Sequence, residues 1–192
     1  STGRQDVFCL SLRDDNTSRN LESFMANVGG VGFDANVCKK VNFEKNTGKS
    51  GKVLYLKALI SNILNFKTFD SVVEADGKEI FRGTTMSIAL GAGKYSGGGM
   101  LQVPDAVLDD GLLDITIIPL MPLHRIIRAV PGLFTGKLLK DNPELISAKC
   151  SSLSIKPLSS PAPLVEVDGE VVGNLPVSIE RLDGQLRVLK NL

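Results

Sequence analysis

The sequence lacks the features on which several classes of protein depend. Tryptophan is absent, histidine occurs once, and aromatic residues make up 5% of the 192 residues. The 22 basic and 21 acidic side chains almost cancel, so no long-range field favours binding to nucleic acid. No apolar run is long enough for a transmembrane helix, and the first residues show no signal-peptide pattern. We therefore expect neither a nucleic-acid partner nor a transmembrane segment.

The chain also lacks the cysteine patterns of disulfide-rich and zinc-binding proteins. Its three cysteines, Cys9, Cys38 and Cys150, are odd in number, widely separated and without C-x-x-C spacing. This pattern predicts a reducing, cytoplasmic location. The single histidine, His124, has no serine or cysteine nucleophile at nucleophile-elbow spacing, so we expect a surface or capping role for it.

What the sequence does contain predicts one domain built mainly of strands. Hydrophobic residues make up 43% of the chain, enough for a single core over residues 1–192. Alternating apolar residues predict strands that are joined by tight turns. The main expected strands span residues 4–13, 80–89, 113–120, 148–157, 163–171, 176–181 and 185–190. Two-residue turns are expected at Asp76–Gly77, Asp168–Gly169 and Asp183–Gly184.

Three segments show signs of helix. Asp34 is the expected N-cap of a short helix over residues 35–43. Residues 53–66 form the strongest amphipathic pattern, but two nearby lysines are too few for a basic membrane-binding face. Packing of this helix on a sheet is therefore favoured. Residues 123–130 also repeat apolar side chains at helical spacing.

Two glycine-rich segments interrupt this pattern. Gly29, Gly30 and Gly32 lack the G-x-G-x-x-G order of a dinucleotide fingerprint. We expect them to break a strand and to form a tight turn, with a secondary role facing a ligand. The second segment, residues 91–114, combines three consecutive glycines, a Pro-Asp turn and an acidic pair followed by glycine. It predicts a site, and its acidic loop offers the oxygen ligands that Mg²⁺ or Ca²⁺ prefer.

Four segments together resemble the lipid kinases related to diacylglycerol kinase and sphingosine kinase, particularly the bacterial enzymes. They are FMANVGGVGFDA (24–35), GAGKYSGGGM (91–100), VPDAVLDDGLLDI (103–115) and VEVDGEVVGNLP (165–176). The resemblance implies an antiparallel β-sandwich-like fold, mainly β with helical insertions. This is the second domain of the NAD kinase/diacylglycerol kinase-like architecture. The Gly-Gly-Asp-Gly-Thr nucleotide loop of the family's N-terminal domain has no match here, so residues 1–192 are expected to be the C-terminal domain alone.

The resemblance also implies which residues act. Asp168 is placed where the family has its catalytic base, and Glu170 assists through a metal or by raising the pKa of its partner. The residues alone allow another interpretation, in which Asp168–Gly169 is only a hairpin turn and Glu170 a solvated side chain. Asn27, Gly97, Gly98 and Gly99 are expected to shape the substrate and nucleotide cleft.

A metal site is implied in the acidic loop. Asp110 is the expected ligand, with the carbonyls of Val107 and Leu112 completing an oxygen shell. This ion is structural or regulatory and distinct from the Mg²⁺ that accompanies ATP. An acidic surface turn without metal is the alternative. The chain departs from the family at Ala92–Gly93, where asparagine usually precedes the glycine.

The function that the resemblance implies is transfer of the γ-phosphoryl group of ATP to a lipid hydroxyl, with Mg²⁺. The expected partners are the lipid substrate, the chain's own N-terminal domain and, by peripheral contact, the inner membrane surface. The isolated fragment is expected to bind ATP weakly and to be inactive. The alternatives are a stand-alone β-sandwich module that binds a ligand or protein without catalysis, and an NAD-kinase-like enzyme. The lipid, whether diacylglycerol or a related molecule, is not encoded in these motifs.

Overall fold

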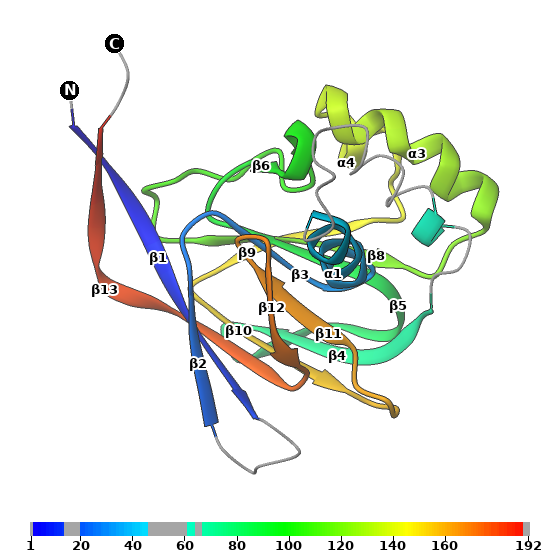
Figure 1. Cartoon of the computed structure of the whole chain (residues 1–192), viewed down its shortest axis with the longest axis horizontal. Coiled ribbons are helices and arrows are strands. Elements are labelled where there is room, and N and C mark those ends of the chain that lie inside the picture. The colour runs from blue at the N-terminus through cyan, green and yellow to red at the C-terminus, as the bar shows by residue number, and fades with distance from the viewer. Residues whose placement is uncertain (1, 14–19, 46–60, 64–66, 190–192) are drawn as a thin grey trace.

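The computed structural model describes residues 2–13, 20–45, 61–63 and 67–189, and an antiparallel β-sheet dominates them (Figure 1). The strands are β1 (Thr2–Arg13), β2 (Asn20–Met25), β3 (Val28–Gly32), β4 (Phe69–Ala75), β5 (Lys78–Gly91), β6 (Tyr95–Ser96), β7 (Met100–Leu101), β8 (Leu113–Pro119), β9 (Ile146–Cys150), β10 (Ser152–Pro157), β11 (Leu164–Val167), β12 (Glu170–Asn174) and β13 (Val177–Leu189). The helices are α1 (Phe33–Lys45), α3 (Leu123–Thr135) and α4 (Leu138–Asp141), and η1 (Gly97–Gly99) is a short 3-10 turn. The predicted fold class is confirmed.

Strand β5 is the centre of the sheet because it pairs with β3, β4 and β8. The eleven-stranded sheet has the order β12-β11-β3-β5-β4-β10-β13-β1-β2, with β8 between β5 and β9. Strands β6 and β7 form a separate small ladder. The order of the strands brings β11, near the end of the chain, beside β3, near its beginning. This pairing places two of the sequence motifs next to each other.

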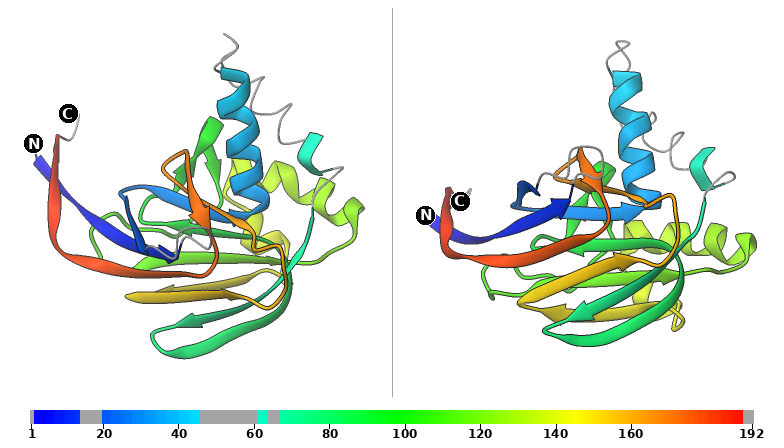
Figure 2. Two further views of the ribbon diagram at one scale, coloured as in Figure 1. Left: turned by 60° about the horizontal axis from the view of Figure 1, so that its bottom comes forward. Right: turned by 90° about the horizontal axis from the view of Figure 1, so that it is seen from below.

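Two apolar cores lie against this sheet. The larger core is enclosed by the sheet itself and takes side chains from nearly every long strand, among them Phe8, Ile88, Ile115 and Ile179. The smaller core joins the sheet to the helices and includes residues of α1, α3 and α4. Figure 2 shows α1 standing out from the sheet, with α3 lying along the body of the molecule. Burial of these faces supplies the main stabilisation, since α1 itself has a weakly apolar sequence.

The glycines of the first glycine-rich segment lie in a strand, so the expected tight turn is wrong. Gly29, Gly30 and Gly32 belong to β3, which is buried along its whole length. A Cβ on Gly29 would lie 2.9 Å from the Glu166 carbonyl oxygen, and one on Gly30 would lie 2.7 Å from Asp34 Cβ. These glycines therefore permit close approach of neighbouring chains rather than reversal of direction.

Two further local predictions are corrected by the tertiary structure. Helix α1 begins at Phe33, so Asp34 lies in its first turn and is not the N-cap. Residues 183 and 184 lie inside the continuous strand β13, opposite a register shift between Asp6 and Phe8 of β1. The D-G pair there forms a bulge and not a hairpin turn. Most of the amphipathic segment 53–66 lies outside the described residues, although residues 61–63 are helical.

Candidate functional site

Asp168 is held at a tight turn by backbone amides from the opposite end of the sequence. Asp168 and Gly169 form the turn between β11 and β12, with φ of 48° and 89°. One carboxylate oxygen accepts hydrogen bonds from the amides of Asn27 and Val28 at 2.9 and 3.0 Å, and the other accepts from Ala26 at 2.7 Å. A carboxylate offers about four lone-pair directions. One direction is therefore left for a substrate proton, so the clamp fixes the carboxylate without using all of it.

Asn27 connects this turn to the second glycine-rich segment. Its side-chain amide donates to the Tyr95 carbonyl oxygen at 3.1 Å, and its own carbonyl oxygen accepts from the amides of Ala92 and Gly93, each at 2.9 Å. Tyr95 lies in β6, directly before the exposed glycines of η1. The structure thus brings together Asp168, Asn27 and the start of the Gly97–Gly99 segment. Glu170 lies exposed at the start of β12.

Two buried acids lie beside this turn, and the sequence motifs did not single out either as a site residue. Asp34 is buried and accepts hydrogen bonds from Ser87 Oγ at 2.8 Å and Gln102 Nε2 at 2.7 Å. Glu166 is also buried and accepts from the Gly169 amide at 3.1 Å. A Cβ on Gly30 would lie 3.3 Å from an oxygen of each carboxyl group. The glycine leaves the space in which the two acids approach each other.

Burial and mutual repulsion keep a proton on this acid pair. Burial, together with the nearby charges of Asp34 and Asp168, raises the pKa of Glu166 to about 8. Burial likewise raises the pKa of Asp34, and its hydrogen bonds from Ser87 and Gln102 oppose this effect. With its pKa raised to about 8, Glu166 holds its proton near neutral pH. The pair can accept a hydrogen bond and can also donate one.

An apolar pocket ends at Asp34. Apart from Asp34 and Gln102, its lining is entirely apolar and comes from α1, β5, α3, α4 and the segments beside them. The lining residues are Phe33, Ile63, Met86, Ile118, Met121, Ile126, Ala129, Val130, Leu133, Leu138 and Leu145. Its cavity volume of about 50 Å³ is well below the roughly 300–1,000 Å³ of a pocket that encloses a lipid-sized ligand.

Helix α1 is fastened to the Asp168–Gly169 turn. The Gly169 carbonyl oxygen accepts from Asn42 Nδ2 at 2.8 Å and from Cys38 Sγ at 2.9 Å. Because Asp34 lies in the first turn of the same helix, α1 joins the polar end of the pocket to the clamped turn. The two parts of the site therefore share one rigid support.

The acidic loop forms a separate group of charges around Lys149 of β9. The Lys149 ammonium lies 3.0 Å from the Asp105 carbonyl oxygen, 3.1 Å from Asp114 Oδ2 and 3.5 Å from Asp110 Oδ2. Asp110 Oδ1 accepts from the Leu112 amide at 3.0 Å. Burial raises the pKa of Asp114, and Lys149 opposes this effect. On β1, buried Asp6 anchors the loop through the Gly111 amide at 2.7 Å.

This arrangement does not fit a divalent ion at Asp110. Both carboxylate oxygens already have partners, and the ammonium of Lys149 supplies a positive charge. Within the described ranges, no three Cys, His, Asp or Glu side chains converge as a metal cluster. The metal site of Asp110 with the Val107 and Leu112 carbonyls stays a prediction that these contacts do not favour.

Only a weak pattern in the sequence indicates that Asp34 and Glu166 are buried near the site. Glu166 lies between Val165 and Val167, a pattern that normally points the charged residue to solvent. All three are buried because β11 has the sheet core on one side and α1 on the other. Asp34 has the sequence context of a helix cap. Only the pairing of β3 with β11 reveals that the two acids are neighbours.

The chain is similar to a known family of domains and to curated proteins. The family model described as the YegS C-terminal NAD kinase beta sandwich-like domain matches residues 27–190. The chain is 26% identical over 179 residues to a diacylglycerol kinase of Mycobacterium tuberculosis, covering 93% of this chain and 55% of that protein. It is 26% identical over 169 residues to a "Probable lipid kinase YegS-like" protein of Alcanivorax borkumensis, covering 86% and 54%. The chain thus spans about half the length of these curated relatives.

Solved structures share the fold. A diacylglycerol kinase from Bacillus anthracis aligns with a TM-score of 0.63 at 18% identity, covering 100% of this chain and 55% of that one. Yeast NADH kinase aligns with a TM-score of 0.54 at 11% identity, covering 97% and 43%. At these identities the likeness concerns the fold alone. In the part of the chain that the structure describes, no helix is both long and apolar enough to cross a bilayer.

Proposed function

Because the chain belongs to the family of YegS C-terminal NAD kinase β-sandwich-like domains, we propose that it is the substrate-side domain of an ATP-dependent lipid kinase. The proposed reaction moves the γ-phosphoryl group of ATP to a lipid hydroxyl. Relatives named diacylglycerol kinase and lipid kinase support this class of reaction. The nucleotide-binding half is assigned to an N-terminal domain outside this sequence.

The observation that carries the proposal is the clamped Asp168 carboxylate. Three backbone amides hold it at the β11–β12 turn and leave one lone-pair direction for a substrate proton. The Asn27 side chain ties this turn to Tyr95, at the start of the glycine-rich segment. The names of the relatives, and not the small pocket beside Asp34, favour the lipid kinase over an NAD-kinase-like enzyme.

The residues of the clamped turn have a defined role in this reaction. Asp168 accepts the hydroxyl proton as the lipid oxygen bonds to the γ-phosphorus and the bond to the β-phosphate oxygen breaks, releasing ADP. Its three amide bonds keep the carboxylate in place before the substrate arrives. Glu166 is buried near Asp168 and Asp34, and burial together with their charges raises its pKa. The Mg²⁺ that accompanies ATP neutralises phosphate charge.

The proposal further holds that the 192-residue chain is inactive alone. Phosphoryl transfer depends on positioning both reactants, so half of the cleft supplies little catalysis. Exposed Glu170 and the Gly97–Gly99 segment lie on the open side of the site, where a second domain would complete it. We expect weak ATP binding and no turnover for this chain.

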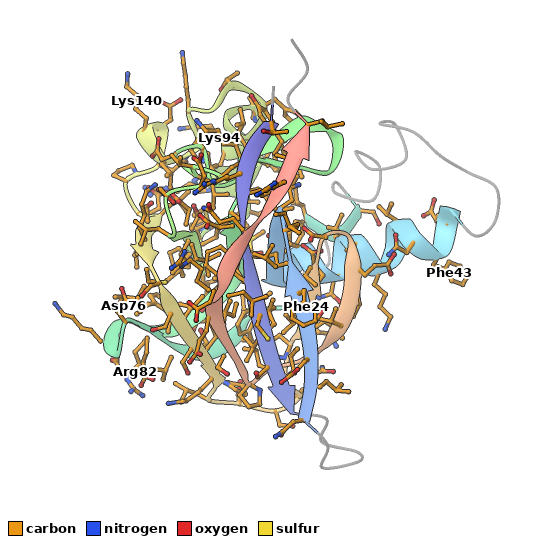
Figure 3. All side chains as sticks on the ribbon, turned by 90° about the vertical axis from the view of Figure 1, so that its left-hand side faces the viewer. Phe24, Phe43, Asp76, Arg82, Lys94 and Lys140 are labelled. Atoms are coloured by element: carbon orange, nitrogen blue, oxygen red, sulfur yellow. The ribbon has the colours of Figure 1, made fainter. Side chains whose placement is uncertain are left out.

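The test uses the longer protein that includes the upstream domain, with a panel of lipids and labelled ATP. We expect lipid phosphorylation, and we expect Asp168→Asn to lower kcat on the order of 10²–10⁴-fold with little change in KM for the lipid. Asp76→Asn is the matched control, because Asp76 also occupies a D-G turn and accepts the amides of Ser151 and Ser152 at 3.0 and 2.9 Å. Figure 3 shows it at the β4–β5 hairpin. Equal kcat for the parent and Asp168→Asn would remove the base role, and no phosphorylation of any lipid would favour a binding module.

A further inference from the structure

Helix α3 carries a stripe of apolar side chains that are exposed in the part of the chain that the structure describes. Leu123, Ile127 and Phe134 are 42, 53 and 45% exposed, and Leu120 just before the helix is 57% exposed. The spacing of Leu123, Ile127 and Phe134 by four and seven residues aligns them on one side of the helix. A contiguous exposed apolar patch of this kind marks an interaction surface. We call these four residues the α3 stripe.

The other side of α3 forms a wall of the apolar pocket. Ile126, Ala129, Val130 and Leu133 line the pocket, and Ile126 is buried. The helix is therefore apolar on two adjacent sides. One side packs against the protein, and the other, the α3 stripe, is exposed. Whatever covers the α3 stripe lies about one helix diameter from this pocket.

The charges around the stripe identify its partner. Residues 120–141, which include α3 and α4, contain Arg125, Arg128, Lys137 and Lys140 against a single acid, Asp141, although the whole chain has a net charge of only +1. Arg125 pairs with Glu144 at 3.3 Å. Arg128 on α3, Lys137 between the two helices and Lys140 on α4 are exposed. This cationic rim complements a negatively charged partner.

We propose that the α3 stripe docks on an anionic lipid bilayer. An interfacial helix inserts its apolar side chains at the boundary between headgroups and acyl chains, while flanking arginine and lysine contact the lipid phosphates. Figure 1 shows α3 on the side of the molecule away from the outer ends of β1 and β13. The inference rests on the proposed lipid substrate, because docking places the domain at the bilayer that holds the lipid.

Vesicle sedimentation of the 192-residue chain tests the proposal without nucleotide or turnover. We expect binding to vesicles of phosphatidylcholine with phosphatidylglycerol, weaker binding in high salt, and little binding to phosphatidylcholine alone. The double change Ile127→Ser with Phe134→Ser should lower the fraction bound at least tenfold. The matched control is Leu21→Ser with Phe24→Ser, which removes side chains that are 41 and 57% exposed on β2. Figure 3 shows Phe24 far from Lys140 of α4.

Separate variants test the cationic rim. Arg128→Glu with Lys140→Glu should weaken binding to anionic vesicles at least tenfold, whereas Lys78→Glu with Arg82→Glu on the β4–β5 hairpin should not. Circular dichroism confirms that each variant is folded. Three results would overturn the proposal: no binding by the folded parent chain, equal losses in the β2 control, or a parent dimer that the stripe variant converts to monomer without a change in vesicle binding. The last result would assign the stripe to a second copy. Because no phosphoryl transfer is measured, failure here leaves the kinase proposal standing.

Discussion

The carboxylate of Asp168 accepts a hydrogen bond from the backbone amide of Asn27 at 2.9 Å, although 141 residues separate them in the sequence. This bond ties the β11–β12 turn to the connection between β2 and β3. The pairing of β3 with β11 brings the two segments together, and the bonds from Ala26, Asn27 and Val28 fix the carboxylate on this connection. The bond joins a two-residue turn and a two-residue connection into one site.

Loss of the Asp168 carboxylate should destabilise the chain. Asp168→Ala leaves the amides of Ala26, Asn27 and Val28 without their acceptor, and we expect a loss of about 2 kcal/mol in unfolding free energy. Asp168→Asn keeps one oxygen and should lose less. Urea denaturation measures both, with Glu170→Gln as the exposed control. If Asp168→Ala is as stable as Glu170→Gln, the amide clamp does not hold the turn.

Glu166 should make stability depend on pH. Its carboxyl titrates near its ordinary value of 4.5 when unfolded and near 8 when folded, so between these values only the folded chain retains the proton. Unfolding free energy therefore falls as pH rises from about 4.5 to about 8, by at most about 1.4 kcal/mol per pH unit. Asp34, whose pKa is also raised, acts in the same direction.

The variant Glu166→Gln should flatten this dependence, because glutamine imitates the protonated acid and can still accept from the Gly169 amide. We expect it to be more stable than the parent at pH 8 and similar at pH 5, measured by urea denaturation at several pH values. Glu180→Gln on the exposed face of β13 is the control. A variant with the parent's slope would show that Glu166 is charged in the folded chain.

Removal of the Lys149 ammonium should destabilise the chain, because the buried carboxylate of Asp114 loses its partner. Asp114 is 3% exposed, so Lys149→Met leaves its carboxylate unpaired and should cost about 2 kcal/mol at neutral pH. Lys156→Met, which breaks a surface pair with Glu74, should cost less than about 1 kcal/mol.

We also expect millimolar Mg²⁺ to leave the melting temperature of the parent unchanged. A rise that Asp110→Asn abolishes would instead assign the predicted metal to the loop.

Gly93 should be intolerant of any side chain. A Cβ at this position would overlap Asn27 Oδ1, so Gly93→Ala must displace the amide that bonds Tyr95. We expect a loss of about 1–3 kcal/mol, measured by thermal denaturation. Gly173→Ala is the matched control, because a Cβ there lies 3.3 Å from the flexible end of Leu12. Equal melting temperatures for the two variants would contradict the close packing of Asn27 on Gly93.

Local signals predicted the features that depend on neighbouring residues. The turns at Asp76–Gly77 and Asp168–Gly169, the strands around them and the helix at 123–130 are all present. The order of four motifs identified the family, which is confirmed by the match over residues 27–190. Local signals failed where a distant strand determines the environment. Gly29 and Gly30 have the composition of a turn, yet pairing with β5 and β11 keeps them in a strand.

By itself the sequence determined the antiparallel β class, the family and the D-G turn that carries Asp168, because hydrophobic alternation and turn chemistry act over a few residues. Only the tertiary structure decided that Asp34 and Glu166 are buried neighbours, that Lys149 neutralises the acidic loop, and that α3 leaves an apolar side uncovered. These properties depend on which strands and helices pack together. Burial and charge proximity arise between segments far apart in the chain, so no local pattern encodes them.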